Sequence, residues 1–213
     1  MAAALFDAEC TRCPRLAKFR RESGVRYPGY HAAPVPAFGA ARPSWLIVGL
    51  APGMHGANRT GRPFTGDHAG IVLYETLHAL GVSSSAVSVS KDDGLKLDGV
   101  RITNAVKCVP PENKPTPAES RSCNAFLRAE FAALDRVRVI VALGRIAHDA
   151  VLDALELSRS AFKFGHAAEH RLGDGRTLVD SYHCSRYNTQ TRRLTPEMFH
   201  AVLARAQAIA AAA

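Results

Sequence analysis

Four of the five cysteines have a spacing that suits a metal site. Cys10 and Cys13 form a C-x2-C pair, and Cys108 and Cys123 lie on either side of a proline-rich segment. Such a pair binds one ion from a short stretch of chain, and two further thiolates complete a four-thiolate site. Zinc and iron–sulfur clusters both accept four thiolates, so the spacing predicts a metal site without choosing between them. Cys184 is expected to be a buried free thiol, which is also the alternative for the other four.

The second segment that could do chemistry is rich in glycine. Residues 49–70 contain six of the sixteen glycines and form neither a P-loop nor a dinucleotide-binding motif. Glycine allows a positive φ and lets backbone N–H groups approach a ligand. Asp67, the only acid here, is expected to cap the helix that follows and also to act on a substrate. Phe64 either packs the loop down or offers a flat surface on which a planar ligand stacks.

A third polar segment follows a short predicted strand near residue 181. Its hydrogen-bond donors and aromatic ring suit phosphates and a stacked base. A lone histidine is usually structural, but this one is expected at the same sheet edge as Asp67 and Asn104, which favours a catalytic role. The segment contains His183, Ser185, Arg186, Tyr187 and Asn188.

Buried strands and helices must position these three segments. Short continuous apolar runs predict strands at residues 45–50, 100–106, 137–143 and 178–181. Helices are expected over residues 1–22, 71–80, 118–134 and 144–155, and from residue 196 onward. Strands that alternate with helices predict an α/β sandwich around a mostly parallel sheet. Ligands bind at the carboxyl ends of such strands, which is where the polar segments fall.

Composition narrows the class of protein. The 213 residues suffice for one domain, and an apolar content of 47% excludes wholesale disorder. The 27 basic residues exceed the 19 acidic ones, and the net charge of +8 favours a polyanionic partner, nucleic acid first. An odd number of cysteines argues against a secreted, disulfide-rich fold. The sequence has no signal-peptide pattern and no run of 18 apolar residues, so we expect a cytoplasmic protein that does not bind membranes.

Three motifs together resemble the uracil-DNA glycosylase superfamily, most of all its type 5, or B-type, iron–sulfur branch. They are G-L-A-P-G-x-H-G-A-N-R-T-G-R-P-F-T-G-D from Gly49, I-T-N-A-V-K-C-x-P-P-x-N-K-P-T-P from Ile102, and S-Y-H-C-S-R-Y-N-T-Q-T from Ser181. The resemblance covers most of the chain. It implies a three-layer α/β/α sandwich with a four-stranded, mostly parallel central sheet. Residues 1–213 would form a single domain with an N-terminal cluster-binding helix.

The resemblance also implies a cofactor and a base-binding site. It assigns a structural [4Fe–4S] cluster to the four cysteines at positions 10, 13, 108 and 123, which resolves the choice of metal by analogy alone. Phe64 matches the aromatic residue that stacks on the flipped base, and Asn104 matches the asparagine that binds the base edge. Gly49 and Ala51 of the first motif are expected to lie against the base.

Two residues carry the implied chemistry. His183 matches the histidine that binds the carbonyl O2 of uracil, and Asp67 matches the acid that positions water. The sequence departs from other branches at residues 50–53, which contain no acid, and at Cys184, where proline or alanine is usual. The first departure fits the type 5 pattern and leaves the activation of water to another group.

The expected function is DNA repair by a monofunctional glycosylase. The enzyme would act as a monomer, flip uracil and other deaminated bases out of double-stranded DNA, and hydrolyse the N-glycosidic bond. Arg59 and the donors at residues 185–188 would contact the DNA. No lysine in the three segments suggests a Schiff base, although Lys107 is near. The alternatives are a non-enzymatic iron–sulfur or zinc module that binds nucleic acid, and an enzyme that binds a nucleotide or a sugar phosphate.

Overall fold

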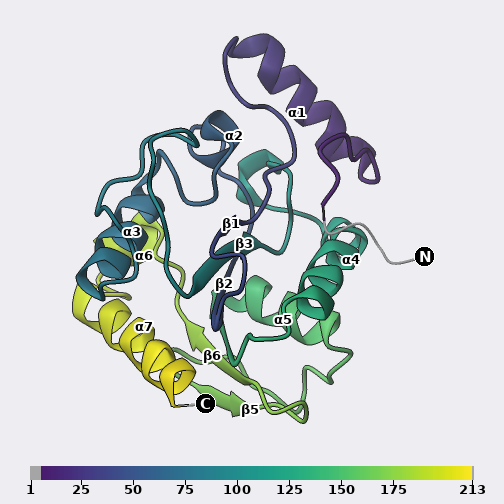
Figure 1. The fold of residues 1–213 in the computed structure, drawn as a ribbon. Helices are drawn as coiled ribbons and strands as arrows, with labels where there is room; N and C mark the ends of the chain where they lie inside the picture. Colours follow the sequence, from purple (N-terminus) through teal and green to yellow (C-terminus); the bar gives the residue numbers. More distant parts are fainter. Residues whose placement is uncertain (1–5, 213) are drawn as a thin grey trace.

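A six-stranded sheet forms the centre of the molecule, in the order β1-β3-β2-β4-β6-β5. The structure is a computed structural model that describes residues 6–212 (Figure 1). The inner four strands are parallel, which confirms the predicted parallel core. They are β2 (Trp45–Gly49), β3 (Val100–Asn104), β4 (Val139–Leu143) and β6 (Thr177–Ser181).

The count of four strands was too low, because two short antiparallel strands border the sheet. β1 (Phe38–Gly39) pairs with β3, and β5 (Glu169–Arg171) pairs with β6. These strands have only two and three residues and leave their side chains partly or fully exposed. Neither contains the continuous apolar run by which a buried strand is recognised in sequence.

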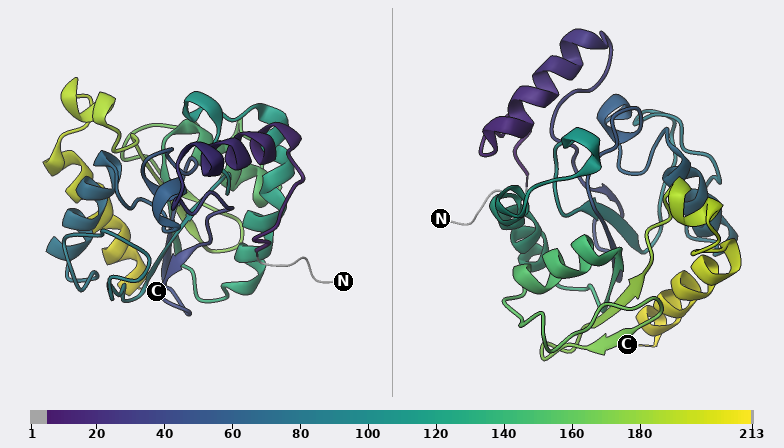
Figure 2. Two further views of the ribbon diagram at one scale, coloured as in Figure 1. Left: turned by 90° about the horizontal axis from the view of Figure 1, so that it is seen from above. Right: turned by 180° about the vertical axis from the view of Figure 1, so that it is seen from behind.

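Alternating side chains of the strands pack against helices on both faces, which confirms the three layers. Trp45 and Ile47 of β2 belong to a core shared with α3 (His68–Ala79) and α7 (Pro196–Ala211). Leu46 and Val48 point to the other face, toward α4 and α5. Figures 1 and 2 show the two helix pairs on opposite sides of the sheet. The two remaining layer helices are α4 (Pro117–Ala133) and α5 (Arg145–Ala154).

The helices of the two layers begin close to the predicted residues because their caps are local. Thr116 caps α4 in a capping box with Glu119, and Pro117 follows at the first helical position. Asp67 caps α3 by accepting a hydrogen bond from the backbone N–H of Gly70, which confirms the predicted cap. Thr195 caps α7 in the same way.

The N-terminal helix differs from the prediction. Residues 1–5 lie outside the described part, residues 6–13 form turns, and α1 spans Pro14–Arg26. Proline suits the first helical position because its missing N–H would have no helical partner there. Cys13 is therefore the residue before the helix, and the C-x2-C pair precedes α1 instead of lying on it. Figure 1 shows α1 apart from the sheet, near the start of α4.

Three short elements in the loops were not predicted. They are α2 (Ala57–Thr60), α6 (Arg186–Gln190) and a 3-10 turn at Pro111–Asn113. Each is too short to show a helical period in sequence. None of the helices in residues 6–212 has the length and apolar content needed to span a bilayer.

Candidate active site

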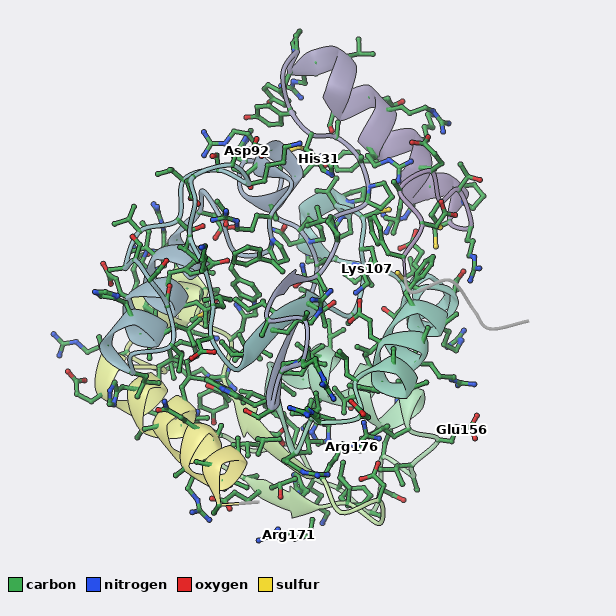
Figure 3. All side chains as sticks on the ribbon, viewed as in Figure 1. His31, Asp92, Lys107, Glu156, Arg171 and Arg176 are labelled. Atoms are coloured by element: carbon green, nitrogen blue, oxygen red, sulfur yellow. The ribbon has the colours of Figure 1, made fainter. Side chains whose placement is uncertain are left out.

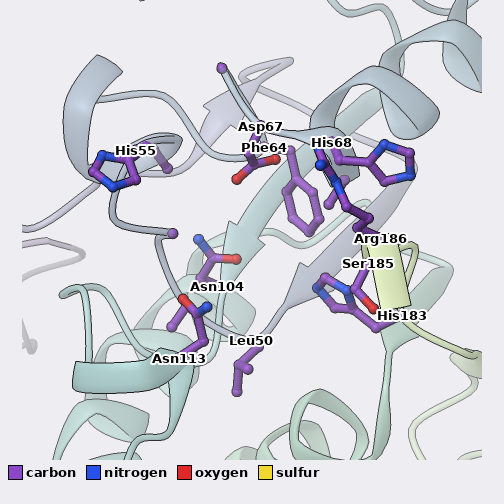
Figure 4. Close-up of a pocket in the computed structure, with 15 residues that line it drawn as sticks. Leu50, His55, Phe64, Asp67, His68, Asn104, Asn113, His183, Ser185 and Arg186 are labelled. Atoms are coloured by element: carbon purple, nitrogen blue, oxygen red, sulfur yellow. The ribbon is translucent and has the colours of Figure 1, made fainter. Parts of the chain in front are cut away.

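A cavity of about 610 Å³ opens at the carboxyl ends of β2 and β3, next to the loop that follows β6. The glycine-rich segment, the end of β3 and the third polar segment all contribute to its wall. Figure 4 shows the side chains of Phe64, Asp67, Asn104 and His183 around one space. The lining residues include Ala51, Phe64, Asp67, Asn104, His183, Ser185 and Arg186.

Gly49 allows Phe64 and Asn104 to meet at the end of β2. A Cβ atom on Gly49 would lie 2.6 Å from the Phe64 ring and 2.5 Å from the Asn104 Oδ1 atom, closer than real contacts allow. Gly49 and Asn104 are register partners on adjacent parallel strands. The Oδ1 atom of Asn104 is buried and has no hydrogen-bond partner among the described residues. A buried acceptor without a partner is rare, and here it lies on the wall of the cavity.

The rings of Phe64 and His183 lie nearly parallel beside each other. Their centroids are 5.9 Å apart and their planes differ by 26°. Burial lowers the pKa of His183, and the charge of Asp67 opposes this shift without reversing it. His183 is therefore a neutral imidazole at pH 7, with one N–H to donate.

Asp67 has one carboxylate oxygen committed to the helix and one directed toward the loop. Oδ1 accepts the hydrogen bond from Gly70 at 2.9 Å. Oδ2 lies against Gly53 and Gly56, where a Cβ atom on either residue would press on the carboxylate. The two glycines thus bring the loop backbone over the carboxylate, and the capping role leaves Oδ2 available for chemistry.

The predicted DNA-contacting residues divide into exposed and engaged groups. Arg59, Arg186 and Tyr187 are exposed, and Arg186 lines the cavity. The Arg59 guanidinium also donates to the carbonyl of Gly66, a residue of the cavity wall, at 3.2 Å. Ser185 caps α6, and the Asn188 side chain donates to the backbone carbonyl of His183 at 2.8 Å. The Asn188 amide is thus already used to hold the loop that carries the histidine.

Three polar residues of the cavity wall do not stand out in the sequence. Asn113 lies beside Asn104 in Figure 4, and its backbone has a positive φ of 56°. His55 pairs through Nδ1 with the Tyr30 hydroxyl at 2.9 Å, and His68 pairs through Nε2 with Thr189 at 2.8 Å. The second motif contains Asn113, but nothing in its local pattern indicates that the proline-rich loop reaches the cavity.

The four predicted cysteines gather in a second, much smaller pocket of about 20 Å³. Cys108 and Cys123 are buried, and Cys10 and Cys13 are partly buried against the same apolar cluster. Burial raises the pKa of Cys123 to about 12, despite opposing contributions from Lys107.

Two donors already point at these sulfur atoms. The Arg20 guanidinium donates to Cys108 Sγ and the Lys107 backbone N–H donates to Cys123 Sγ, both at 3.2 Å. Donors of this kind stabilise thiolates and orient the ligands of metal sites.

Cys184 and Lys107 are both excluded from the chemistry of the cavity. Cys184 is fully buried and donates to the Ala69 carbonyl at 3.4 Å, as expected of a free thiol. Lys107 lies in the interior, where its ammonium donates to Thr103 and to Glu130 (Figure 3). No lysine lines the cavity within residues 6–212.

A third cluster of ionisable groups lies outside both pockets. His148 contacts Asp180 through Nδ1 at 2.8 Å and the carbonyl of Phe162 through Nε2 at 3.0 Å. Both partners are acceptors, so the contacts favour a ring that carries a proton on both nitrogens. Burial alone would lower the pKa of His148, but the hydrogen bond and the charge of Asp180 outweigh it and raise that pKa. His170 adds a contact to the same carboxylate at 3.3 Å, which completes a hydrogen-bonded network.

Comparison with known proteins places the chain in a family. The sequence profile of the "Uracil DNA glycosylase superfamily" matches residues 36–207. The "Type-5 uracil-DNA glycosylase" of Thermus thermophilus is 51% identical over 206 residues, which cover 94% of both chains. Proteins of the same name from Mycobacterium tuberculosis and Pyrobaculum aerophilum are each 44% identical, over 94% and 93% of this chain and 78% and 88% of theirs. The chain belongs to the uracil-DNA glycosylase superfamily and, within it, to the type 5 branch.

Proposed function

We propose that this chain removes uracil from DNA by hydrolysing the N-glycosidic bond, which leaves an abasic site. One observation carries the proposal: an aromatic ring, an unpartnered amide oxygen, a neutral imidazole and a carboxylate surround one cavity at the sheet edge. The substrate is double-stranded DNA that contains uracil or another deaminated base, and the enzyme acts as a monomer. The described residues form a single domain, and the segment before α1 contributes Cys10 and Cys13.

The base must leave the helical stack before it can enter the cavity. Extrusion costs a few kcal/mol and is least costly for a mispaired base such as uracil opposite guanine. Phe64 stacks on the extruded base, and the Asn104 amide binds its edge. Gly49 and Ala51 leave room for the base because neither places a large side chain in the cavity.

His183 stabilises the departing base. Negative charge develops on the base as the bond stretches, and the neutral imidazole donates a hydrogen bond to it. One such preorganised donor contributes about 3 to 4 kcal/mol to transition-state stabilisation. Asn188 supports this role by holding the carbonyl of the same residue.

Asp67 acts on the sugar side of the bond. Positive charge develops on the sugar in the transition state, and a carboxylate both stabilises that charge and orients an attacking water. The oxygen not used by the helix cap is the one available for this role. The Asn113 side chain, on the wall of the cavity, is placed to hold the same water.

Water, and not a lysine, is the nucleophile. Within residues 6–212 no lysine lines the cavity. The buried Lys107 is not available, because its ammonium is paired with Glu130 at 2.8 Å. The enzyme is therefore monofunctional and does not cut the DNA strand. Borohydride should trap no covalent adduct with DNA, and a trapped adduct would contradict this part of the proposal.

The cysteine pocket holds a [4Fe–4S] cluster with a structural role. Cys10, Cys13, Cys108 and Cys123 supply the four thiolates that this group requires. A single zinc ion binds thiolates at about 2.3 Å and so needs sulfur atoms roughly 3.8 Å apart. Within residues 6–212, no three of these sulfur atoms lie within 4.8 Å of one another, so the wider spacing favours the larger cluster. When bound, the cluster supplies covalent ties between the N-terminal segment, the β3 loop and α4.

DNA binds across the mouth of the cavity. Arg59 and Arg186 are placed to neutralise phosphates, Ser185 to donate to them, and the exposed ring of Tyr187 to contact the sugar or a neighbouring base. The net charge of +8 also favours binding to a polyanion such as DNA. Because phosphate contacts release counterions, affinity should fall as the salt concentration rises.

One assay separates this function from its alternatives. The protein is incubated with duplex oligonucleotides that carry uracil or hypoxanthine at one position, followed by hot alkali, which cleaves abasic sites. We expect alkali-dependent cleavage at uracil and none in a thymine control. A binding module would shift the duplex in a gel without producing abasic sites, and that result would overturn the proposal.

A further inference from the structure

Phe64 has a backbone conformation that an aromatic residue rarely adopts. Its φ is 53°, in the left-handed region, where the side chain of a bulky residue is strained. Such strain persists only where surrounding contacts determine the conformation, and it concentrates at functional sites. Gly70 packs directly against the Phe64 carbonyl, and Tyr74 donates to the Pro63 carbonyl at 3.1 Å. These contacts come from α3 and restrain the backbone at Pro63 and Phe64.

A buried ion pair holds the chain two residues before Phe64. The Arg62 guanidinium contacts both carboxylate oxygens of Asp93, at 2.8 and 3.0 Å, and its side chain is 2% exposed. It also donates to the Ser88 hydroxyl at 2.9 Å and to the Lys91 carbonyl at 3.1 Å. Bidentate pairs of this kind fix geometry as well as supplying attraction. Although Arg62 is one of the basic residues of the first motif, it does not face DNA.

The same turn also holds the residue after Phe64. The Thr65 hydroxyl lies 2.7 Å from the Ser88 hydroxyl; Thr65 is fully buried and Ser88 is partly buried. Ser88 therefore contacts both neighbours of the Pro63–Phe64 pair, one on each side. A rotation of the Phe64 backbone would break at least one of these contacts.

Asp93 organises the turn that makes these contacts. Its carboxylate accepts backbone N–H bonds from Val89 and Leu95 at 2.9 Å and from Ser90 at 3.2 Å. Burial alone would raise the pKa of Asp93, but these bonds and Arg62 keep it far below the usual range. The carboxylate is thus ionised at neutral pH.

We propose that residues 88–93, here named the Asp93 turn, are a positioning element for the base-binding site. The turn holds both flanks of Phe64 and so fixes the plane on which the base stacks. This segment lies in the connection between α3 and β3, and no catalytic motif contains it. The inference rests on the proposed function, because it acts through the base-stacking ring.

The test is a double-mutant cycle on uracil excision. Asp93→Asn keeps the size of the side chain and removes its charge, and Phe64→Ala removes the ring. Excision is measured as single-turnover rate with excess enzyme, well below the melting temperature of each variant. Displacement of a catalytic surface by about 1 Å reduces rates roughly 100-fold, so we expect a loss of that order for Asp93→Asn. In the Phe64→Ala background the same substitution should change the rate less than about threefold.

The control substitution is Asp98→Asn, at an exposed position in the same connection between α3 and β3 but outside the Asp93 turn. It should leave both the rate and the melting temperature unchanged. If Asp93→Asn does not fold, Ser88→Ala removes only the shared hydroxyl and replaces it in the same cycle. Equal losses with and without the Phe64 ring would overturn the positioning role and leave only a structural one. A wild-type protein that excises nothing would refute the proposed function itself, and the inference with it.

Discussion

The base cavity and the cysteine pocket both join residues that are distant in sequence, but they treat their polar atoms in opposite ways. The cavity, of about 610 Å³, leaves the Asn104 oxygen without a hydrogen-bond partner among residues 6–212. The cysteine pocket, of about 20 Å³, already supplies donors to its sulfur atoms from Arg20 and Lys107. A site that awaits a transient ligand keeps its polar groups free, whereas a site for a permanent group has its supporting contacts in place. Substitutions in the first should therefore change rates, and substitutions in the second should change folding.

The largest effect is expected in the cysteine pocket. Cys123→Ser removes one thiolate from the core of the structure and should abolish most of the folded yield, because binding of a structural metal group contributes directly to folding. The matched control is Cys184→Ser, where the new hydroxyl can keep the hydrogen bond to Ala69 and should cost about 1 kcal/mol. For both variants we would measure the soluble yield and the absorbance band near 400 nm. A colourless Cys123→Ser protein with full stability would show that the pocket holds no structural cluster.

The second-largest effect is expected on the cleavage rate, from a substitution of Asp67 in the cavity. Asp67→Asn keeps the helix cap, because asparagine caps as well as aspartate, and removes the charge. We expect cleavage to fall about 1,000-fold, within the range for general acid–base groups, while DNA binding survives. Asp67→Ala should lose the same activity and about 1 kcal/mol of stability besides, from the lost cap. Wild-type cleavage by Asp67→Asn would remove the carboxylate from the mechanism.

A smaller effect tests whether close packing shapes the cavity. In Gly49→Ala the added methyl group must displace Phe64 or Asn104, which should lower the excision rate roughly 100-fold and destabilise the fold by about 1–3 kcal/mol. Gly173→Ala is the control, because no atom lies within 4 Å of its added Cβ. The two rates, measured with the same uracil duplex, should differ. Equal activity of the two variants would mean that the contact at the end of β2 is not needed for base binding.

The smallest effect belongs to His148, which lies in neither site. Its raised folded-state pKa means that it stabilises the protein fully below the unfolded value near 6.5 and loses this contribution as pH rises through the folded value. His148→Gln should therefore lower the melting temperature more at pH 6 than at pH 9. The loss in free energy of unfolding should be larger at pH 6 than at pH 9 by on the order of 1 kcal/mol. Excision at pH 6 should persist. A gap in melting temperature that does not depend on pH would show that the imidazole is not charged in the folded protein.

Local patterns predicted much of the fold, and several of the residues singled out in the sequence line the cavity or the cysteine pocket. The inner strands are continuous apolar runs, and such runs indicate burial on both faces whatever the tertiary arrangement. The helix that begins at residue 117 carries its own start signal in Thr116 and Glu119. The predicted N-terminal helix was wrong at its start, because Pro14 marks a first turn that the composition of residues 1–22 does not reveal. The edge strands were missed because two or three residues have no period.

The sequence by itself determined which chemical groups are present and on which strand ends they fall. Cysteines, a carboxylate, an imidazole and an aromatic ring at set distances along the chain define the available chemistry. Only the tertiary structure decided which of these groups are free to act. Arg62 and Arg59 are nearly adjacent in one basic motif, yet the first is buried against Asp93 and the second is exposed. The cause is a partner 31 residues away, since burial and pairing depend on contacts between distant segments that no local pattern contains.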